Sequence, residues 1–430
     1  MRMQSAATRV AKMAATMAAM AIAAMLAVAL VGRTATACPF CSAPMKTFGE
    51  EIESMDVAVI AVLAEGAERA VGGAAADERV PTARFTVVEV LKGKEHLAGA
   101  KSVETIYFGG ADPGKAFLIM GVGAPKLMWS TPLPIAAESR DYFRKIVTLP
   151  KEGPERLTFF LSYLENPDDM LARDAYDEFA KAPYSEVQKI KDQIDHDQLL
   201  KWIESPDIPA TRRRLYLTLL SIRGTSDDVE MLEKLLRSED RKSRSGLDAL
   251  VACYLTLQGP EGVDLVEELF LENKKAEYAD TYAAIMALRF HGTEVEFIPR
   301  ERLVEALRLM LDRPELADLV IPDLARWEDW DSMPRLTELF KNADEKSSWV
   351  RVPVINYLRA CPLPEAKERI EELEKIDPEA VRRANTFFPF NRPAAPASSS
   401  ASPLRRRTGE IVSESALTVV PANHSGRSTA

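Results

Sequence analysis

Two cysteines separated by two residues are the most reactive side chains that the sequence places side by side. They form the tetrapeptide Cys38-Pro39-Phe40-Cys41. This spacing is found at the dithiol centre of thiol redox enzymes, where a preceding strand and a following helix N-terminus lower the thiol pKa. A c-type haem site would require histidine at Ser42 and is excluded. The other interpretation is a disulfide between Cys38 and Cys41 that staples the chain locally.

The other side chains that could do chemistry are few and scattered. The histidines are His96, His196, His291 and His424, with no pair at helical spacing and none in a cysteine cluster, so no histidine-rich zinc site is expected. No Gly-x-Ser-x-Gly nucleophile motif occurs. Cys253 and Cys361 have apolar neighbours, which predicts buried thiols. We therefore expect no catalytic residues, no metal ligands and no cofactor.

One glycine motif is superficially similar to a phosphate-binding loop. The run from Gly109 to Lys115 fits Gly-x-x-x-x-Gly-Lys, but Ala116 replaces the Ser or Thr whose hydroxyl would hold magnesium. An apolar run and a further Gly-Val-Gly follow, in place of a helix whose N-terminus would face the phosphates. The motif is predicted to be a hairpin turn between strands.

The first 37 residues are typical of a secretory signal peptide. Basic residues precede an apolar stretch from Met13 to Val31, and Ala35-Thr36-Ala37 supplies the small residues that a signal peptidase accepts. Cleavage after Ala37 would make Cys38 the mature N-terminus and predicts a periplasmic, cell-surface or secreted protein. The alternatives are a retained N-terminal anchor and a lipid on Cys38. With no strand before Cys38, the disulfide is favoured over a redox centre.

The composition of the chain limits the classes of partner that it is expected to bind. The 430 residues include 55 basic and 65 acidic side chains, and removal of the signal peptide leaves a net charge of −14. Such a chain would repel phosphate backbones, so nucleic acid is not an expected partner. No stretch after the signal peptide is long and apolar enough to predict a membrane span.

Residues 38–150 are predicted to form a small β-domain. Thr47 and Glu50 have the spacing of a capping box, which predicts a short helix. Turns rich in Gly or Pro separate apolar, β-branched segments. These predicted strands are Val57–Leu63, Phe85–Leu91, Val103–Phe108, Phe117–Val122 and Leu127–Ser130. Five short strands with one flanking helix favour a small barrel of the OB type.

The order of these segments resembles the netrin-like modules of tissue inhibitors of metalloproteinases and their bacterial relatives. The resemblance rests on a cysteine at the mature N-terminus, followed by 56–60, 85–93 and 114–119. In those inhibitors the amine and carbonyl of the N-terminal cysteine chelate the protease zinc, and Cys38 is the matching position. The chain departs from the family pattern, Cys-x-Cys, and has no cysteine between Cys41 and Cys253 to supply the later disulfides. The resemblance covers about a quarter of the chain.

From residue 154 to 384 the apolar positions recur every three or four residues, which predicts paired helices. The expected second helices are Asp228–Arg237, Gly262–Glu272, Glu301–Asp312, Ser332–Lys341 and Pro364–Lys375. The expected first helices are Leu215–Ile222, Leu247–Leu257, Tyr278–Phe290, Leu316–Trp327 and Trp349–Ala360. Asn166–Ala182, with Pro167 as its first helical residue, and Ser185–Ile203 are predicted to be opening hairpin helices.

The period of these pairs, roughly 31–39 residues, resembles that of HEAT-type repeats, in a combination seen in exported bacterial proteins. One helix pair cannot bury its apolar face alone, so neighbouring pairs are expected to stack and to leave an extended surface for a protein or peptide partner. The predicted fold class is therefore multidomain α+β, with a small OB-like barrel, a HEAT-like solenoid and a disordered tail at 385–430 that is rich in Pro, Ala and Ser.

Two tryptophans mark a candidate contact within the repeats. Trp327 and Trp330 stand between two helices, and tryptophan is enriched at interface hot spots. The alternative is that the two indoles fill the gap between adjacent helix pairs while the neighbouring acids cap the next helix. The sequence as a whole favours a non-enzymatic extracytoplasmic interaction scaffold. A metalloprotease inhibitor acting through Cys38 is the alternative.

Overall fold

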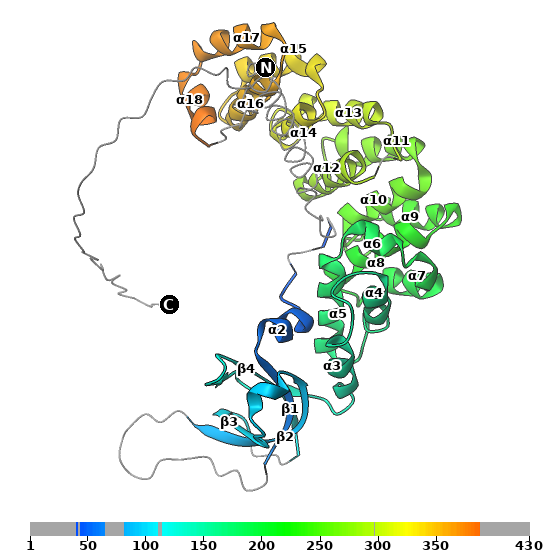
Figure 1. The fold of residues 1–430 in the computed structure, drawn as a ribbon. Coiled ribbons are helices and arrows are strands. Elements are labelled where there is room, and N and C mark those ends of the chain that lie inside the picture. The colour runs from blue at the N-terminus through cyan, green and yellow to red at the C-terminus, as the bar shows by residue number, and fades with distance from the viewer. Residues whose placement is uncertain (1–39, 42–43, 65–80, 111–113, 296, 388–430) are drawn as a thin grey trace, which may run out of the picture.

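The computed structural model describes residues 40–41, 44–64, 81–110, 114–295 and 297–387. The predicted signal peptide, Cys38, His424 and the tail after residue 387 lie outside these residues. Figure 1 shows a β-rich part that leads into a curved array of helices. Within the described part of the chain, no helix has the length and apolar character needed to cross a bilayer.

The β-rich part is one antiparallel sheet that curls into a nearly closed barrel. The strand order is β3-β2-β1-β4-β5, and β6 also pairs with β4. The strands are β1 (Val57–Leu63), β2 (Thr82–Lys92), β3 (Ser102–Ile106), β4 (Ala116–Val122), β5 (Met128–Trp129) and β6 (Leu133–Ile135). The five predicted strands are present, and β6 was not predicted because its three residues include a proline.

Strand β1 is apolar throughout because both of its faces are buried. Side chains alternate between the faces of a strand. Val57 and Val59 belong to the core inside the barrel, whereas Ala58 and Ile60 belong to the core shared with the helices. The prediction of a hairpin turn at Gly109–Lys115 is wrong. This stretch connects β3 to β4, which are not neighbours in the sheet.

Helix α2 (Phe48–Ser54) connects the two parts and has the predicted capping box between Thr47 and Glu50. The chain then forms α3 (Arg140–Ile146), α4 (Pro154–Leu161), α5 (Asp169–Lys181), α6 (Tyr184–Gln188) and α7 (His196–Glu204). Three expectations need correction here. Helix α3 precedes the boundary predicted at residue 154, α5 begins after an Asp168 cap rather than at Pro167, and the helix predicted over 185–203 is divided into α6, a short 3-10 turn and α7.

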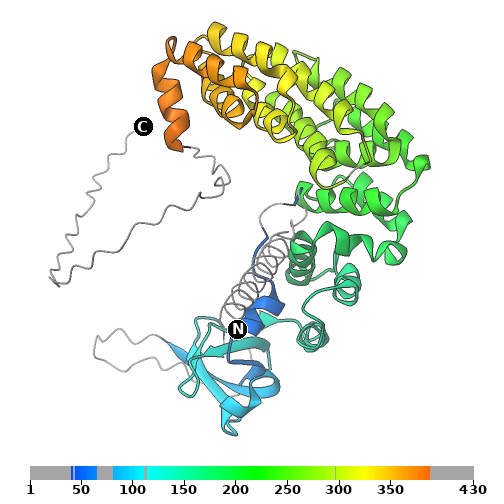
Figure 2. The ribbon, with the colours of Figure 1, turned by 45° about the horizontal axis from the view of Figure 1, so that its top comes forward.

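The remaining helices alternate between an inner and an outer row of the arc (Figures 1 and 2). The inner row is α8 (Ala210–Arg223), α10 (Leu247–Gln258), α12 (Tyr278–Thr293), α14 (Ile321–Arg326) and α16 (Arg351–Ala360). The outer row is α9 (Val229–Leu236), α11 (Val263–Val266), α13 (Arg300–Arg308), α15 (Met333–Asn342) and α17 (Pro364–Glu374), and α18 (Pro378–Phe387) ends the array. These agree with the predicted helix pairs, and one continuous apolar core joins them to the outer face of the sheet.

Arginine–aspartate pairs link successive inner helices at a nearly constant sequence separation. Arg214 of α8 pairs with Asp248 of α10 at 2.7 Å, and Arg289 of α12 pairs with Asp323 of α14 at 2.6 Å. Arg244, just before α10, pairs with Asp280 of α12 at 3.0 Å. These ion pairs lie beside the apolar core and are partly shielded from water. They therefore help to fix how one helix pair is aligned on the next.

A buried ion pair joins α4 to α5 beside the junction with the β-domain. Arg156 of α4 donates to Glu178 of α5, with an Nε–Oε2 distance of 2.7 Å, and both side chains are about nine-tenths buried. Arg156 also donates to the carbonyl of Pro150 and lies over the ring of Phe160. Its guanidinium lies against Gly49 of α2, where a side chain would collide with it.

We predict that Glu178→Gln lowers the free energy of unfolding by about 3 kcal/mol, because it leaves the Arg156 charge buried without a partner. Replacement of both partners, Arg156→Met with Glu178→Leu, should recover most of that loss. Glu233→Gln is the matched control, because it breaks an exposed pair with Arg237 and should cost less than about 1 kcal/mol. Chemical denaturation measures all three, and equal losses for the buried and exposed pairs would contradict the assignment.

Candidate binding surface

The chain before α2 lies along the inner side of the helical array (Figure 1). We call residues 40–47, without 42 and 43, the N-terminal segment. It contacts α12 at one end and α5 at the other, so it spans several helices of the array. Repeat proteins use the extended surface of their stacked helices to bind partners, and the N-terminal segment lies across such a surface.

Phe40 anchors the far end of the N-terminal segment. Its side chain is 6% exposed, and its ring meets Phe290 of α12 edge-on with 5.0 Å between the ring centroids. The ring of Tyr184 on α6 contacts the ring of Phe290 with 5.5 Å between the centroids. The Tyr184 hydroxyl lies 3.4 Å from the hydroxyl of Ser221. Three aromatic rings from distant parts of the sequence therefore form one cluster, which we call the Phe40 subsite.

Two carboxylates of α5 hold the near end of the segment by its backbone. The Met45 N–H donates to Asp177 at 3.2 Å, and the Phe48 N–H donates to Asp174 at 2.7 Å. Asp174 also accepts a short hydrogen bond from the hydroxyl of Tyr142 on α3. Because Phe48 is the first residue of α2, Asp174 satisfies one of the unpaired N–H groups at that helix N-terminus.

Burial raises the pKa of the Asp174 carboxyl to about 7. The hydrogen bonds from Tyr142 and Phe48 oppose this shift, and the nearby carboxylates of Glu178 and Asp177 add to it. The sequence analysis missed these acids. Their signal was an Asp-x-x-Asp-Glu run within the apolar face of a helix, where acidic side chains are buried only if they have partners.

Helix α12 presents a ridge of large side chains spaced by four residues, so successive members lie next to each other while the ridge turns gradually around the helix. The ridge consists of Tyr278, Tyr282, Met286 and Phe290. Phe290 is covered by Phe40, but Tyr278 and Tyr282 are 58% and 40% exposed. The two tyrosine rings stack with 6.1 Å between centroids and 6° between planes. We call them the tyrosine pair.

Charged side chains surround the tyrosine pair. Arg241 pairs with Glu277, the residue before Tyr278, and Arg244 pairs with Asp280, which lies between the two tyrosines in sequence. Paired charges around exposed aromatic rings resemble the polar rim and apolar centre of a protein interface.

The predicted contact residues Trp327 and Trp330 lie in the packing between helix pairs. Trp327 is 9% exposed, and its ring lies against Gly292 of α12, where a side chain would collide with the indole. Trp330 is half-buried and its ring lies 5.3 Å from that of Tyr357. The expected helix cap by the neighbouring acid is wrong, because Asp329 pairs with Arg308 and accepts from Ser332 instead.

The potential catalytic side chains are held in separate structural contacts. His196 bonds Asp228 at 2.9 Å, which ties α7 to the start of α9 and raises the pKa of the imidazole. His291 is buried in the core, and burial lowers its pKa to about 4. Cys253 and Cys361 are free and buried, as predicted. Over the described ranges, no three His, Cys, Asp or Glu side chains gather in a cluster that could hold a metal ion.

Cys41 is disulfide-bonded and half-buried against the array core. Its predicted partner, Cys38, lies outside the described residues, so the pairing of these two cysteines stays a prediction.

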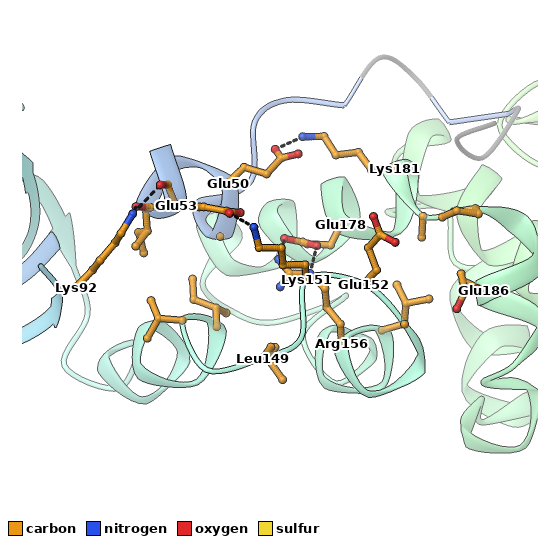
Figure 3. Close-up of a pocket in the computed structure, with 18 of the residues that line it drawn as sticks. Glu50, Glu53, Lys92, Leu149, Lys151, Glu152, Arg156, Glu178, Lys181 and Glu186 are labelled. Carbon is orange, nitrogen blue, oxygen red and sulfur yellow. Dashed lines mark hydrogen bonds and ion pairs between the residues drawn. The ribbon is translucent and has the colours of Figure 1, made fainter. Parts of the chain in front are cut away.

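A cavity of about 590 Å³ opens at the junction of the β-domain and the array (Figure 3). Apolar side chains, among them Ile52, Leu91 and Leu149, line it together with charged ones. The basic groups that line the cavity already have partners in the described structure. Lys151 pairs with Glu53 and Lys181 with Glu50, while Lys92 donates to backbone carbonyls at the end of α2. Because these basic side chains already have partners, the cavity does not indicate an anion site.

No protein-family profile matches the sequence, and neither the curated proteins nor the solved structures include a significant match.

We predict that Asp174→Asn removes a pH dependence of stability. The pKa in the folded state, about 7, lies above the ordinary value of 3.8, so this group favours folding most below pH 3.8 and that contribution is lost as the pH rises to 7. Asparagine keeps an oxygen that can accept from Phe48. The stability of the variant relative to the wild type should therefore rise by about 1–3 kcal/mol between pH 4 and pH 7, and then stay level.

Thermal unfolding of both proteins across that pH range measures the difference. His291 titrates in the same window, but it is present in both proteins and cancels. A difference that does not change with pH would show that Asp174 does not titrate there.

We predict that Trp330→Ala lowers the free energy of unfolding by about 2 kcal/mol, because it removes the ring packed on Tyr357. Phe297→Ala is the control. Phe297 is 55% exposed, so its loss should cost about 0.5 kcal/mol or less. Denaturant titration tests both, and unchanged stability of the Trp330 variant would restore this residue as a binding candidate.

Proposed function

We propose that this chain is a non-enzymatic, extracytoplasmic interaction protein that binds a protein or peptide partner on its helical array. We interpret the array as HEAT-like repeats and the barrel as an OB-type, netrin-like module that forms a second contact region. The export signal predicted at residues 1–37 supports the extracytoplasmic location.

The observation that carries this proposal is the tyrosine pair. Large aromatic side chains in a soluble chain are usually covered, and exposed ones with a polar rim are typical of interface hot spots. Stacking holds the two rings in place before any partner arrives. Little side-chain entropy is therefore lost when they are covered, which favours binding.

The use of the polar side chains supports a role without catalysis. Asp174 holds the N-terminal segment, His196 ties two helices together, and His291 lies in the core. General acid–base chemistry needs such groups to converge on one place that a substrate can reach. In the described structure each of them serves a separate packing contact.

The alternative function is inhibition of a metalloprotease through the amine of Cys38. That function requires the mature N-terminus to project into a protease active site. Phe40, only two residues further, is buried against Phe290, which favours the array surface over the inhibitor. Sequencing of the mature N-terminus is a direct check, since any end other than Cys38 eliminates the inhibitor.

We predict that the variant Tyr278→Ala/Tyr282→Ala captures at least tenfold less partner than the wild type, since hot-spot side chains contribute about 2 kcal/mol or more each. The full mature chain is immobilised and exposed to cell-envelope extract, and the bound proteins are quantified by mass spectrometry. Phe297→Ala, which removes an exposed aromatic ring outside the ridge, should capture as much as the wild type.

A protein retained equally by the wild type and the double variant would refute the tyrosine pair as the contact. The melting temperature of the double variant should remain within a few degrees of the wild type, because both rings are exposed.

A further inference from the structure

We propose that the N-terminal segment is an intramolecular ligand of a peptide groove on the inner face of the array. The partner then presents an extended segment whose aromatic side chain takes the place of Phe40. This inference rests on the proposed function and specifies the chemistry of the partner at the array surface.

The Phe40 subsite supplies the specificity. Phe290 packs edge-on against Phe40, and Tyr184 packs against the same Phe290 ring and supports it. Phe40 is 6% exposed. Edge-to-face packing of this kind contributes about 0.5–1.5 kcal/mol beyond the burial of apolar area. An aliphatic residue would gain only the burial, so the subsite favours an aromatic side chain.

A carboxylate of α5 supplies affinity with little sequence preference. Asp177 accepts from the backbone N–H of Met45, which every residue except proline can offer, whereas Asp174 binds the N–H of Phe48 at the start of α2. Met45 lies five positions after Phe40 in the sequence. The groove therefore recognises an aromatic residue followed, five positions later, by a free backbone donor.

The N-terminal segment fills only one end of the α12 ridge. Phe290 is covered by Phe40, whereas Tyr282, eight residues earlier on the same ridge, is 40% exposed. At 1.5 Å per residue the two positions are about 12 Å apart along the helix. A partner that continues past the Phe40 subsite can therefore contact the tyrosine pair.

Those added contacts let a partner compete with a tethered ligand. A segment joined to the array by a short connection acts at an effective concentration of about millimolar. A free peptide with the same contacts would be excluded by it. A partner that also covers the tyrosine pair gains contacts that the exposed rings of the free protein leave unused, and can displace the segment.

The test uses an oxidised synthetic peptide of residues 38–43, Cys-Pro-Phe-Cys-Ser-Ala, with 4-fluorophenylalanine at its aromatic position. Its 19F signal is followed as the full-length protein is added. In the Phe40→Ala protein the subsite is vacant, so the signal should broaden. The wild type should need at least tenfold more protein for the same broadening, because its own Phe40 occupies the subsite.

Two controls make the result specific. Phe40→Ala combined with Phe290→Leu, which removes the ring that meets Phe40 edge-on but keeps apolar bulk in α12, should weaken the broadening. If Phe40→Ala does not fold, Phe40→Leu replaces it, because leucine keeps the apolar bulk but loses the edge-to-face contact, and broadening should then lie between the two extremes. Equal broadening by wild type and variant, or none with the folded variant, overturns the proposal.

This outcome is separable from the capture experiment on the tyrosine pair. The Phe40→Ala protein retains Tyr278 and Tyr282, so it should capture the envelope partner at least severalfold better than the wild type once the competitor is gone. Tyrosine-dependent capture without any peptide signal would support the interaction scaffold and refute the peptide groove. A peptide signal without tyrosine-dependent capture would support the peptide groove and refute the tyrosine pair as the contact.

Discussion

The structure depends on one continuous apolar core that runs from the outer face of the β-sheet to the last helix of the array. A single helix pair cannot bury its apolar face alone, so each pair must cover the next. At the start of the array, the outer face of the sheet joins this core. Ala58 and Ile60 on the outer face of β1 share the core with the helices, while Val57 and Val59 on its other face fill the barrel. The β-domain therefore closes the open end of the array.

This closure has an electrostatic consequence at α5. The helix packs against α4 and α8, and its Asp174 meets α2 and α3, so its polar groups lose their water and must find partners. Glu178 binds Arg156, Asp174 binds the first N–H of α2, and Asp177 binds the N–H of Met45 in the N-terminal segment. Burial without a cation explains why the pKa of Asp174 lies near 7. The same constraint that joins the domains therefore also creates acceptors for an extended chain.

Local patterns predicted most of the fold and little of the site. Helical periodicity placed the ten helices of the five pairs, and the capping box at Thr47 and Glu50 placed α2, because these signals depend on residues a few positions apart. The contact of Phe40 with Phe290 joins positions 250 residues apart, and no local pattern encodes it. The sequence interpretation of Cys38-Pro39-Phe40-Cys41 as a terminal disulfide considered the two cysteines. It overlooked the aromatic residue between them.

Trp327 and Trp330 show the opposite difficulty. Tryptophan is common both at interfaces and in cores, and only the burial of the side chain distinguishes the two.

The α12 ridge shows how one element can be part of the core and of a binding surface. Its residues repeat every four positions, so the ridge turns slowly around the helix and passes from buried to exposed along its length. Phe290 lies where the N-terminal segment crosses, and Tyr278 lies where nothing in the described chain covers it. The buried end fixes the helix in the array, and the ion pairs of Arg241 and Arg244 fix the exposed end. Because both ends are held by contacts that exist before binding, a ligand meets a preformed surface, and the free energy of its contacts is not spent on ordering the helix.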